Sequence, residues 1–252
     1  MQQHVFVLTG ASRGMGAAMA TQLLAPGHRL LCISRHRSDA LAAQAEAAGA
    51  PCEQWALDLS QPAPVAAQLQ AWLAALDLNA VAGATLINNA AALTRIGPID
   101  AGSDAELSAA LRVSLEAPLL LSAAFLRGTR DWAGPRRVLN ISSGLGRRAM
   151  AGQASYCAAK AGMDHFSRAL ALDEANRRNG AKVVSLAPGV IDTDMQVQLR
   201  AGDPAGFPEQ ANFIGLKEKG QLTSAADAAA RVLAYLARAD FGSNPVADVR
   251  DA

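Results

Sequence analysis

A tyrosine and a lysine in the second half of the chain have the spacing of an acid–base pair. Tyr156 and Lys160 stand four positions apart, so a helix over this segment places both side chains on one face. An ammonium group beside a phenol favours the phenolate and lowers a phenol pKa that is ordinarily ~10. We therefore expect Tyr156 to exchange a proton near neutral pH, with Lys160 lowering its pKa. The pair on its own also fits an amphipathic helix with a half-buried tyrosine.

Two serines precede this pair. Ser142 and Ser143 follow the apolar run Val138 to Ile141, and Ser143 lies thirteen positions before Tyr156. A serine hydroxyl can donate a hydrogen bond to a carbonyl oxygen on which charge develops, while a phenol supplies the proton. Ser143 and Tyr156 are therefore candidates for the catalytic and substrate-binding groups of a carbonyl reduction. Ser142 is the alternative to Ser143.

Alternating apolar runs and alanine-rich segments indicate the elements that must position these groups. Short runs that are apolar at consecutive positions predict strands covered by helices on both faces: Val5 to Leu8, Leu30 to Ile33, Ala84 to Ile87, Val138 to Ile141 and Val183 to Leu186. Longer segments between them predict helices: Met15 to Leu24, Asp39 to Ala48, Ala63 to Leu76, Asp104 to Arg127, Ala154 to Asn176 and Ala225 to Ala237. The alternation predicts an α/β fold with a doubly wound parallel sheet.

Length and composition narrow the classes of protein. The chain has 252 residues, a length at which α/β proteins commonly form one domain, so we expect a single domain over residues 1–252. Hydrophobic residues make up 51% and charged residues 18%, which excludes a disordered chain. A net charge of +1 supplies no basic field for nucleic acid. The expected partners are small molecules and other copies of the chain.

The other reactive residue types predict neither a disulfide nor a metal site. Cys32, Cys52 and Cys157 form no C-x-x-C pair, and we expect buried thiols in a reducing compartment. The 4 histidines lack paired ligand spacing. No signal-peptide pattern follows Met1, and apolar runs such as Ala117 to Leu126 are too short to span a bilayer. We expect a cytoplasmic protein that does not insert into membranes.

A glycine-rich turn follows the first predicted strand and opens directly into the first predicted helix. Glycines let the backbone turn tightly and approach a pyrophosphate, whose charge meets the free amide groups at the helix N-terminus. The place of the turn at the head of a series of βαβ units favours this interpretation over an ordinary strand-to-helix turn. The residues expected to bind a cofactor here are Gly10, Ser12, Arg13, Gly14, Met15 and Gly16.

The end of the second predicted strand favours NADP(H) over NAD. An NAD-binding protein usually carries an acidic side chain here for the ribose hydroxyls, whereas a cation suits a 2′-phosphate. This chain has Ser34, Arg35 and His36, without a carboxylate. We expect Ser34 and Arg35 to contact the cofactor, with Arg13 reaching the same phosphate through charge-assisted hydrogen bonds. Either arginine also fits a solvated surface residue.

Residues 200–220 interrupt the alternation of strands and helices. Glycines and prolines are scattered among charged residues in this segment. Long loops in compact α/β domains are often lids over sites. We therefore predict a flexible substrate flap over residues 200–220, with a disordered surface insertion as the alternative.

Together these motifs resemble those of the short-chain dehydrogenase/reductase family, in the family's order and over essentially the whole chain. The resemblance implies a Rossmann-type sheet of about seven strands with helices on both faces. It also implies an NADP-dependent oxidoreductase that acts on CH-OH or C=O groups. Within the family, Tyr156 to Lys160, Pro188 to Gln196 and the C-terminal residues look most like sepiapterin reductases and related bacterial diketone reductases. The spacing to Tyr156 favours Ser143 over Ser142.

The resemblance implies further cofactor contacts. Lys160 would hold the nicotinamide ribose in addition to lowering the pKa of Tyr156. Asp58 and Leu59 would contact the adenine. The segments after the fourth and sixth strands would lie beside the cofactor and line the nicotinamide carboxamide, through Asn88, Asn89, Ala90, Pro188, Gly189, Ile191 and Thr193.

Two positions depart from the family pattern. Most members have an asparagine where this chain has Ser114, and that asparagine helps to hold a water leading to the lysine. A serine hydroxyl can hold the same water, so Ser114 is included among the expected catalytic residues. Ala91 replaces a glycine and is expected only to tighten the backbone packing.

The C-terminal residues resemble those of sepiapterin reductases, in which an aspartate pairs with the pterin. Asp248 is thus a candidate substrate anchor, since a carboxylate offers two acceptors to neighbouring ring donors. The alternative is a charged, solvated terminus. Met195 is a candidate apolar wall for a flat substrate, or a residue that fills a core gap. Asp192 and Asp194 are expected to be solvated loop charges.

The leading hypothesis is an NADPH-dependent carbonyl reductase that acts on a vicinal dicarbonyl or a pterin side-chain ketone. Small aromatic diketones or quinones are the alternative substrates. A hypothesis from another class is a sensor that binds NADP(H) without chemistry, which only Ser114 favours. The family resemblance implies a homodimer or homotetramer. The helices Asp104 to Arg127 and Ala154 to Asn176 would supply the interface, unless both bury their apolar faces internally.

Overall fold

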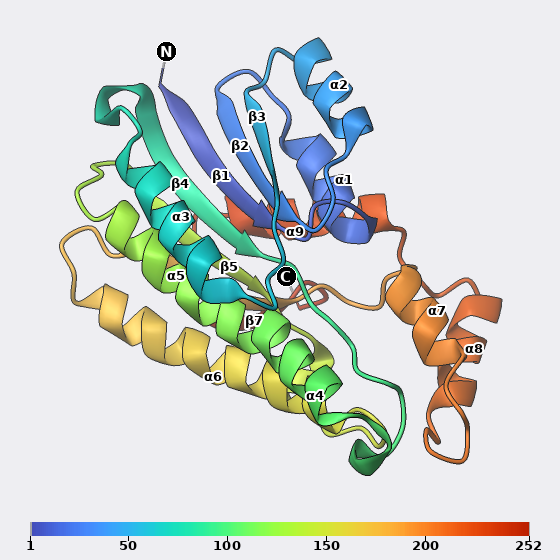
Figure 1. Cartoon of the computed structure of the whole chain (residues 1–252). Coiled ribbons are helices and arrows are strands. Elements are labelled where there is room, and N and C mark those ends of the chain that lie inside the picture. The colour runs from blue at the N-terminus through green and yellow to red at the C-terminus, as the bar shows by residue number, and fades with distance from the viewer. Residues whose placement is uncertain (1, 252) are drawn as a thin grey trace.

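Seven parallel strands form one sheet in the computed structural model, which describes residues 2–251. Their order across the sheet is β3-β2-β1-β4-β5-β6-β7 (Figure 1). The strands are β1 (Gln3–Thr9), β2 (His28–Ser34), β3 (Cys52–Ala56), β4 (Val81–Asn88), β5 (Arg136–Ile141), β6 (Lys182–Ala187) and β7 (Val246–Asp248). This arrangement confirms the predicted fold class, a Rossmann-type doubly wound parallel sheet.

Helices cover both faces of the sheet, as Figure 1 shows. One face packs against a group of three helices, α1 (Gly14–Leu23), α2 (Asp39–Ala47) and α9 (Ala225–Ala237). The other face packs against α3 (Pro62–Ala74), α5 (Ala117–Gly128) and α6 (Ala154–Ala175), and α4 (Asp104–Leu111) leads into α5. Each predicted helix is present, with ends within a few residues of those expected.

The central strands are buried on both faces. In β1, Val5 and Val7 belong to the core on the α3 side, whereas Phe6 and Leu8 belong to the core on the α1 side. Successive side chains of a strand point to opposite faces, so a strand that is apolar at every position contributes to two cores. The same pattern does not predict β3 or β7, because these short edge strands contain polar residues.

The helix that begins at Asp104 continues to Gly128, because α4, a π-helical segment (Arg112–Glu116) and α5 follow one another without a break. With 25 residues and an apolar composition, this helix is long enough to cross a membrane, contrary to the expectation from the sequence. Half of its most apolar window is nevertheless buried inside the fold. Leu121 and Phe125, for example, are fully buried in the core between the sheet and α3. Core packing therefore explains the apolar composition.

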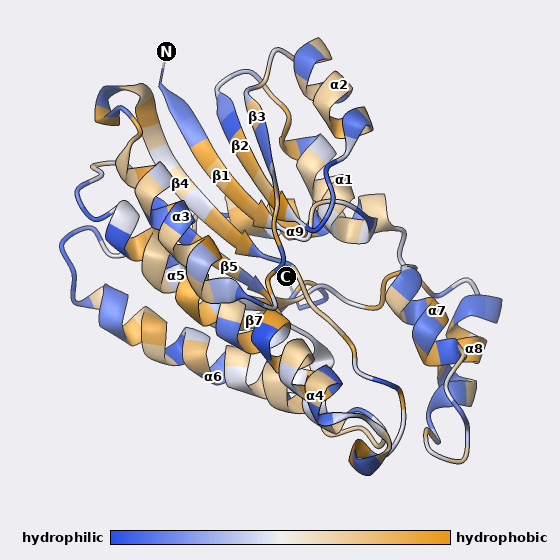
Figure 2. Ribbon diagram, viewed as in Figure 1, coloured by the Kyte–Doolittle hydropathy of each residue, from blue (hydrophilic) through white to orange (hydrophobic). Residues whose placement is uncertain are grey.

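The segment after β6 departs furthest from the prediction. It contains α7 (Asp194–Arg200) and α8 (Gln210–Glu218), which Figure 1 shows beside each other and away from the sheet. The predicted flap over residues 200–220 thus contains a helix and the fully buried Phe207. Figure 2 shows hydrophilic and hydrophobic residues mixed in α7 and α8, whereas the strands are mostly hydrophobic. The flexibility of this segment stays a prediction.

Leucine truncation in the long helix tests the core packing. Leu121 on α5 is fully buried, whereas Leu172 on α6 is 70% exposed. Leu121→Ala leaves a cavity, so the free energy of unfolding should fall by about 2–5 kcal/mol. The matched control Leu172→Ala should change it by less than about 0.5 kcal/mol. Urea unfolding followed by circular dichroism measures both, and equal losses from the two variants would contradict this packing.

Candidate active site

The winding of the sheet reverses beside β1. From β1 the chain proceeds outward to β2 and β3, and it then returns to place β4 on the other side of β1. Because the strands are parallel, the segments that follow them meet at one edge of the sheet. Ligands of open α/β sheets bind outside the carboxyl ends of the strands at such a reversal. The glycine turn after β1 and the segment after β4 flank this point.

The glycine turn is folded too closely for side chains. Gly10 and Gly14 have φ angles of 70° and 55°, a region that favours glycine. A Cβ atom on Gly16 would lie 2.1 Å from the carbonyl oxygen of Gly10, so a side chain cannot be accommodated at the start of α1. Ser12 is exposed on the turn, and Met15 is buried beneath it. This cradle fits a pyrophosphate at the N-terminus of α1.

Side chains at the ends of β1 and β2 and just after β4 hold the turn in this shape. Asn89 donates hydrogen bonds from Nδ2 to the carbonyl oxygens of Thr9 at 2.9 Å and Gly10 at 3.2 Å. The Thr9 hydroxyl accepts hydrogen bonds from the backbone of Asn89 at 2.9 Å and Ala90 at 3.0 Å. Ser34 Oγ accepts another from the backbone of the turn at 2.8 Å. These residues brace the cradle, and their contact with the cofactor stays a prediction.

The predicted catalytic residues meet at the end of β5 and the start of α6. Ser143 follows β5, and its Oγ accepts a hydrogen bond from the backbone N–H of Leu145 at 3.2 Å. Tyr156 and Lys160 lie on successive turns of α6, with Lys160 Nζ 5.6 Å from the centroid of the tyrosine ring. The Ser143 hydroxyl is close enough to the phenol to affect its pKa. The fold thus brings these groups together.

The acid–base properties of Tyr156 differ from the prediction. Desolvation by the surrounding protein raises the pKa of Tyr156 to about 12, although hydrogen bonding with Ser143 opposes this rise. The Lys160 ammonium donates a hydrogen bond to the carbonyl oxygen of Ile141 at 2.6 Å, which directs one of its protons away from the phenol. Burial lowers the pKa of Lys160 to about 8. The Tyr156 pKa is therefore not near neutrality as expected, because desolvation of the phenol dominates. The effect of Lys160 on it stays a prediction.

The structure separates the two candidate serines. Ser142 is buried and donates a hydrogen bond from Oγ to Asp164 at 2.5 Å, whereas Ser143 is partly accessible beside Tyr156. Ser143 is therefore the serine that a substrate can reach. The sequence does not lead us to predict Asp164 as a site residue. A carboxylate four positions after a lysine is ordinary on a helix surface, and only the fold shows that this one is buried.

Ser114 lies in the π-helical segment between α4 and α5 and is buried. Its hydroxyl accepts a hydrogen bond from the backbone N–H of Ala92 at 3.0 Å and donates one to the carbonyl oxygen of Ala92 at 3.2 Å. π-helical turns occur frequently at functional sites. Ser114 thus fixes the segment that follows β4. Its role in holding a water for Lys160 stays a prediction.

The two arginines predicted to bind a 2′-phosphate are both exposed. Arg35 directly follows β2. Arg13 Nη1 forms an ion pair with Asp194 Oδ2 at 2.9 Å. Asp192 likewise pairs with Lys217. Asp192 and Asp194 are thus accessible to solvent as expected, although each also pairs with an exposed cation from another segment and Asp194 begins α7 instead of lying in a loop.

Residues that the family resemblance assigns to the two ends of the cofactor border the same edge. Beyond β3, Asp58 is exposed and Leu59 is buried in the core. Beyond β6, Pro188 is buried and Gly189 has a φ angle of 83°. Thr193 lies next to the glycine turn, since a Cβ atom on Gly14 would be 3.4 Å from its Cγ2 atom. Ile191 pairs with Thr223 in an isolated parallel bridge.

Met195 belongs to a small apolar core beside the catalytic groups, which we name the apolar cluster. Its residues come from the segments after β4 and β5 and from α6, α7 and the region of α8. Two members, Leu145 and Cys157, lie within two positions of Ser143 and Tyr156 in the sequence. The cluster consists of Leu93, Ile96, Leu145, Met150, Cys157, Met195, Leu199, Phe207 and Phe213.

Asp248 ends β7 and is only 5% exposed, so the alternative of a solvated terminus is wrong. Its Oδ1 accepts a hydrogen bond from Arg250 Nε at 2.8 Å, and its Oδ2 accepts one from Arg250 Nη2 at 2.6 Å. Arg147 Nη1 lies 3.9 Å from the same Oδ2. A pterin would have to replace Arg250 at this carboxylate. The substrate contact stays a prediction.

The cysteines are unpaired, but they are not all buried as expected. Cys32 is buried, whereas Cys52 and Cys157 are partly accessible at the sheet edge and at the start of α6. Within residues 2–251, no three His, Cys, Asp or Glu side chains are grouped in a way that could hold a metal ion.

Known proteins share this sequence and fold. The short chain dehydrogenase family model matches residues 4–204. A benzil reductase ((S)-benzoin forming) of Bacillus cereus is 34% identical over 218 residues, which cover 86% of this chain and 88% of the relative. A sepiapterin reductase of Meriones unguiculatus is 34% identical over 259 residues, which cover 98% of this chain and 96% of the relative.

A solved structure supports the same assignment. The crystal structure of a short-chain dehydrogenase/reductase from Burkholderia vietnamiensis is 33% identical, covers 99% of this chain and 100% of its own, and has a TM-score of 0.66. These similarities agree with the glycine cradle and with the grouping of Ser143, Tyr156 and Lys160. The chain belongs to the short-chain dehydrogenase/reductase family, and it is an oxidoreductase that uses a nicotinamide cofactor to interconvert alcohol and carbonyl groups.

Proposed function

We propose that the protein is an NADPH-dependent carbonyl reductase that acts on vicinal diketones with apolar substituents. The observation that carries the proposal is the apolar cluster beside Ser143 and Tyr156. A diketone can bury its substituents against this cluster while one carbonyl oxygen reaches the two hydroxyls. The Bacillus cereus relative is named for benzil, an aromatic vicinal diketone. This similarity supports the same class of substrate here.

The residues at the carboxyl edge of the sheet fit a nicotinamide dinucleotide. The cradle formed by Gly10, Gly14 and Gly16 would hold the pyrophosphate, because glycines let the turn pack closely on itself and on its neighbours while the backbone N–H groups at the start of α1 remain available to the anion. Lys160 would hold the nicotinamide ribose, and Gly189 and the residues up to Thr193 would border the ring. When bound, NADPH supplies the hydride for the reduction.

Ser143 and Tyr156 would act on the carbonyl oxygen of the substrate. Ser143 would donate a hydrogen bond to this oxygen, where negative charge develops. With a pKa of about 12, Tyr156 is protonated at neutral pH, and its phenol can transfer a proton to the stronger base, an alkoxide. With a pKa of about 8, Lys160 carries a charge near neutrality and would stabilise the resulting phenolate.

Two alternatives have less support. A pterin side-chain ketone fits the similarity to sepiapterin reductase, but its proposed anchor, Asp248, is already paired with Arg250. Met195 lies in the apolar cluster, where it would border either substrate. A sensor that binds NADP(H) without chemistry would not need Ser143, Tyr156 and Lys160 together. The complete set therefore favours an enzyme.

The preference for NADPH rests on charge at the end of β2. Arg35 is exposed there, and neither it nor its neighbours Ser34 and His36 is a carboxylate. A guanidinium would bind the 2′-phosphate through charge-assisted hydrogen bonds. Arg13 would join this contact only by leaving Asp194. Arg35 is therefore the main determinant that we propose.

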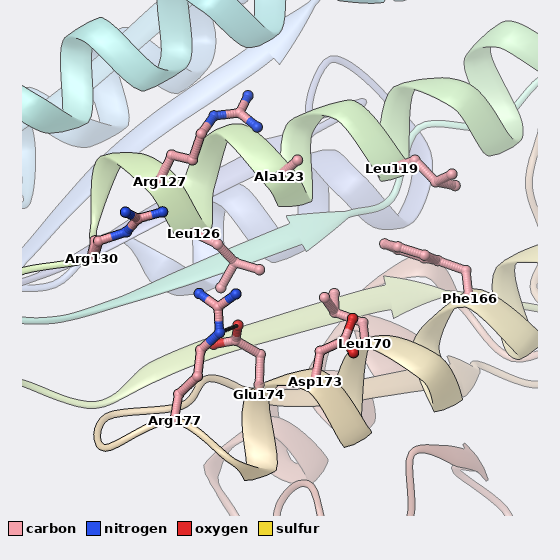
Figure 3. A pocket seen from close by; sticks show the side chains of 10 residues that line it. All are labelled: Leu119, Ala123, Leu126, Arg127, Arg130, Phe166, Leu170, Asp173, Glu174 and Arg177. Atoms are coloured by element: carbon pink, nitrogen blue, oxygen red, sulfur yellow. Dashed lines mark ion pairs between the residues drawn. The ribbon is translucent and has the colours of Figure 1, made fainter.

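We also propose a homo-oligomer, in which α5 and α6 face a second copy of the chain. A cavity of about 310 Å³ lies between these helices. Figure 3 shows the apolar side chains of Leu126 and Leu170 in the gap, with Arg127 and Arg130 on α5 and its end and Asp173 on α6. Arg127 is bound to Gln70 on α3, so a twofold axis would bring Arg130 of each copy toward Asp173 of the other. This self-complementary charge pattern supports a second copy as the partner.

The cysteines and the net charge bear on the location and the partners of the protein. Unpaired cysteines are compatible with a reducing compartment, and we propose a cytoplasmic protein. A net charge of +1 gives no reason to expect nucleic acid as a partner.

Turnover of a substrate panel tests the proposed function. With benzil, the wild-type protein should consume NADPH, measured as loss of the reduced nicotinamide absorbance. Tyr156→Phe removes the proton donor, so kcat should fall by roughly 10²–10⁴-fold while NADPH binding persists. The matched control Tyr235→Phe, on α9, should leave kcat unchanged. Undiminished turnover by Tyr156→Phe would exclude this donor, and binding of NADPH without turnover of any diketone, quinone or sepiapterin would favour the sensor.

Reversal of charge at Arg35 tests the cofactor preference. Arg35→Asp removes a phosphate contact and adds repulsion, so the ratio of kcat/KM for NADPH to that for NADH should fall roughly 10–100-fold. Arg178→Asp makes the same charge change at the opposite edge of the sheet and serves as the control. Steady-state kinetics with both cofactors measures the ratio. A ratio unchanged in Arg35→Asp would remove Arg35 from the phosphate site.

Insertion of a charge between α5 and α6 tests the homo-oligomer. Leu119→Arg places a cation in the cavity and should convert the assembly to a monomer of 26.0 kDa. Leu78→Arg makes the same change at a residue that is 51% exposed elsewhere, and it should leave the assembly intact. Light scattering coupled to size-exclusion chromatography measures the mass. A monomeric wild-type protein would refute the proposal.

A further inference from the structure

A buried carboxylate lies directly next to the catalytic pair. Asp164 stands on α6 one turn beyond Lys160 and is 1% exposed. Its Oδ1 accepts hydrogen bonds from the hydroxyls of Ser142 at 2.5 Å and Ser185 at 2.7 Å. Its Oδ2 accepts a hydrogen bond from Arg147 Nε at 3.2 Å. The proposed reaction uses none of these three donors, so their convergence on one carboxylate requires a separate explanation.

Asp164 and Lys160 hold consecutive residues at the end of β5. Lys160 donates to the carbonyl oxygen of Ile141, and Asp164 accepts from the hydroxyl of Ser142. Side chains four positions apart lie on one face of a helix, so two adjacent turns of α6 grip two adjacent residues of the strand end. Ser143 is the next residue. These two contacts therefore set the position of Ser143 relative to α6.

The turn after Ser143 lies against α6 without room for a side chain. A Cβ atom on Gly146 would be 2.8 Å from Asp164 Oδ2 and 2.9 Å from the carbonyl oxygen of Lys160. Arg147 follows directly and turns its guanidinium back onto Asp164. The turn that begins at Ser143 is thus fixed to the helix at both ends, by Ser142 and by Arg147.

Arg147 extends the contact to the last strand. Its Nη2 donates a hydrogen bond to the carbonyl oxygen of Ala247 at 2.8 Å, and its Nη1 lies 3.9 Å from Asp248. The Arg147 side chain is only 32% exposed. Asp164 is thus connected to the end of β5 through Ser142, to β6 through Ser185, and to the turn and β7 through Arg147.

The charge of Asp164 also acts on Lys160. Burial lowers the pKa of Lys160 to about 8, and the Asp164 carboxylate opposes that fall. Two charged groups from other elements lie near Asp164. Arg147, from the turn, forms an ion pair with it, and Asp248, from β7, lies behind Arg147. Ser142 and Ser185 from β5 and β6 are neutral. On α6 itself, Lys160 faces the ring of Tyr156.

We propose that Asp164 is a positioning residue of the active site, which fixes the Ser143 turn on α6 and whose negative charge keeps Lys160 protonated. The role deepens the carbonyl reductase function proposed above and depends on it. Asp164 touches neither substrate nor cofactor in this scheme. It acts through Ser143 and Lys160, so its loss should affect the chemical step more than binding.

Kinetics of an isosteric variant test the positioning role. Asp164→Asn keeps the size of the side chain but loses the charge and one acceptor. A small displacement of Ser143 from Tyr156 should lower kcat for diketone reduction roughly 10–100-fold, with KM and the Kd for NADPH changed by less than about threefold. Asp131→Asn makes the same change at an exposed position after α5 and should leave kcat as in the wild-type protein.

Titration of Lys160 tests the electrostatic role and needs no substrate. The chain has Lys160, Lys182, Lys217 and Lys219, so NMR of isotopically labelled lysine side chains can follow each of them, with Lys160→Met to assign the signal. The Lys160 pKa should be about 8 in the wild-type protein. It should fall by roughly one pH unit in Asp164→Asn. In Arg147→Gln it should rise, because a cation beside Asp164 is lost.

The two readouts separate this proposal from the proposed function. Opposite displacements of the Lys160 titration in Asp164→Asn and Arg147→Gln support the electrostatic role even if no carbonyl substrate is found. A wild-type enzyme that reduces diketones, together with an Asp164→Asn variant of equal kcat and equal Lys160 titration, overturns the proposal and leaves the function intact. If Asp164→Asn does not fold, Arg147→Gln decides: an unchanged Lys160 titration and unchanged kcat would equally overturn it.

Discussion

Helix α6 is attached to the end of β5 through a buried ammonium group. Lys160 is 1% exposed and donates a hydrogen bond to the carbonyl oxygen of Ile141. A buried charge is costly unless it is hydrogen-bonded and balanced. Here the carbonyl oxygen supplies the acceptor, and Asp164 supplies the opposite charge on the next turn. The hydroxyls of Ser143 and Tyr156, which we propose to be catalytic, lie on either side of this attachment and therefore take their separation from packed secondary structure instead of from a loop.

If Tyr156 is the proton donor that we propose, its environment suits reduction of a carbonyl better than oxidation of an alcohol. A phenol with a pKa raised to about 12 holds its proton firmly, which fits a group that must deliver a proton to an alkoxide. Oxidation of an alcohol would require the phenolate as a base, and desolvation disfavours that form. Cys157, a member of the apolar cluster, adjoins Tyr156 in the sequence.

Much of this architecture is encoded locally and can be predicted from the sequence. The doubly buried strands follow from runs such as Val5 to Leu8, and the cradle follows from glycines at positions where the backbone meets itself, as Gly16 meets Gly10. The grouping of Ser143, Tyr156 and Lys160 follows from family spacing. The pKa of Tyr156 does not, because desolvation depends on residues brought together only by folding.

Long-range pairs are the other part that sequence spacing does not reveal. From the sequence, Asp164 has the spacing of an ordinary helical carboxylate. Only the folded structure shows that β6 and the turn after β5 pack around it. The burial of Asp248 against Arg250 is likewise not evident from the sequence, and neither is the exposed pair between Asp194 and Arg13. The edge strand β7 cannot be predicted from the sequence either, because its three residues include an aspartate and show no apolar pattern.

The ion pair between Arg13 and Asp194 joins the glycine turn to α7 across 181 positions of the chain. An anionic group that binds Arg13 would compete with Asp194 for the same guanidinium. Thermodynamic linkage makes such competition reciprocal. If the anion favours release of α7 by a given factor, release of α7 raises the affinity for the anion by the same factor. Because both partners are exposed, dissolved salt would weaken the pair. Binding of the coenzyme at Arg13 and release of α7 would then depend on the same ion pair, and a change in ionic strength would alter both.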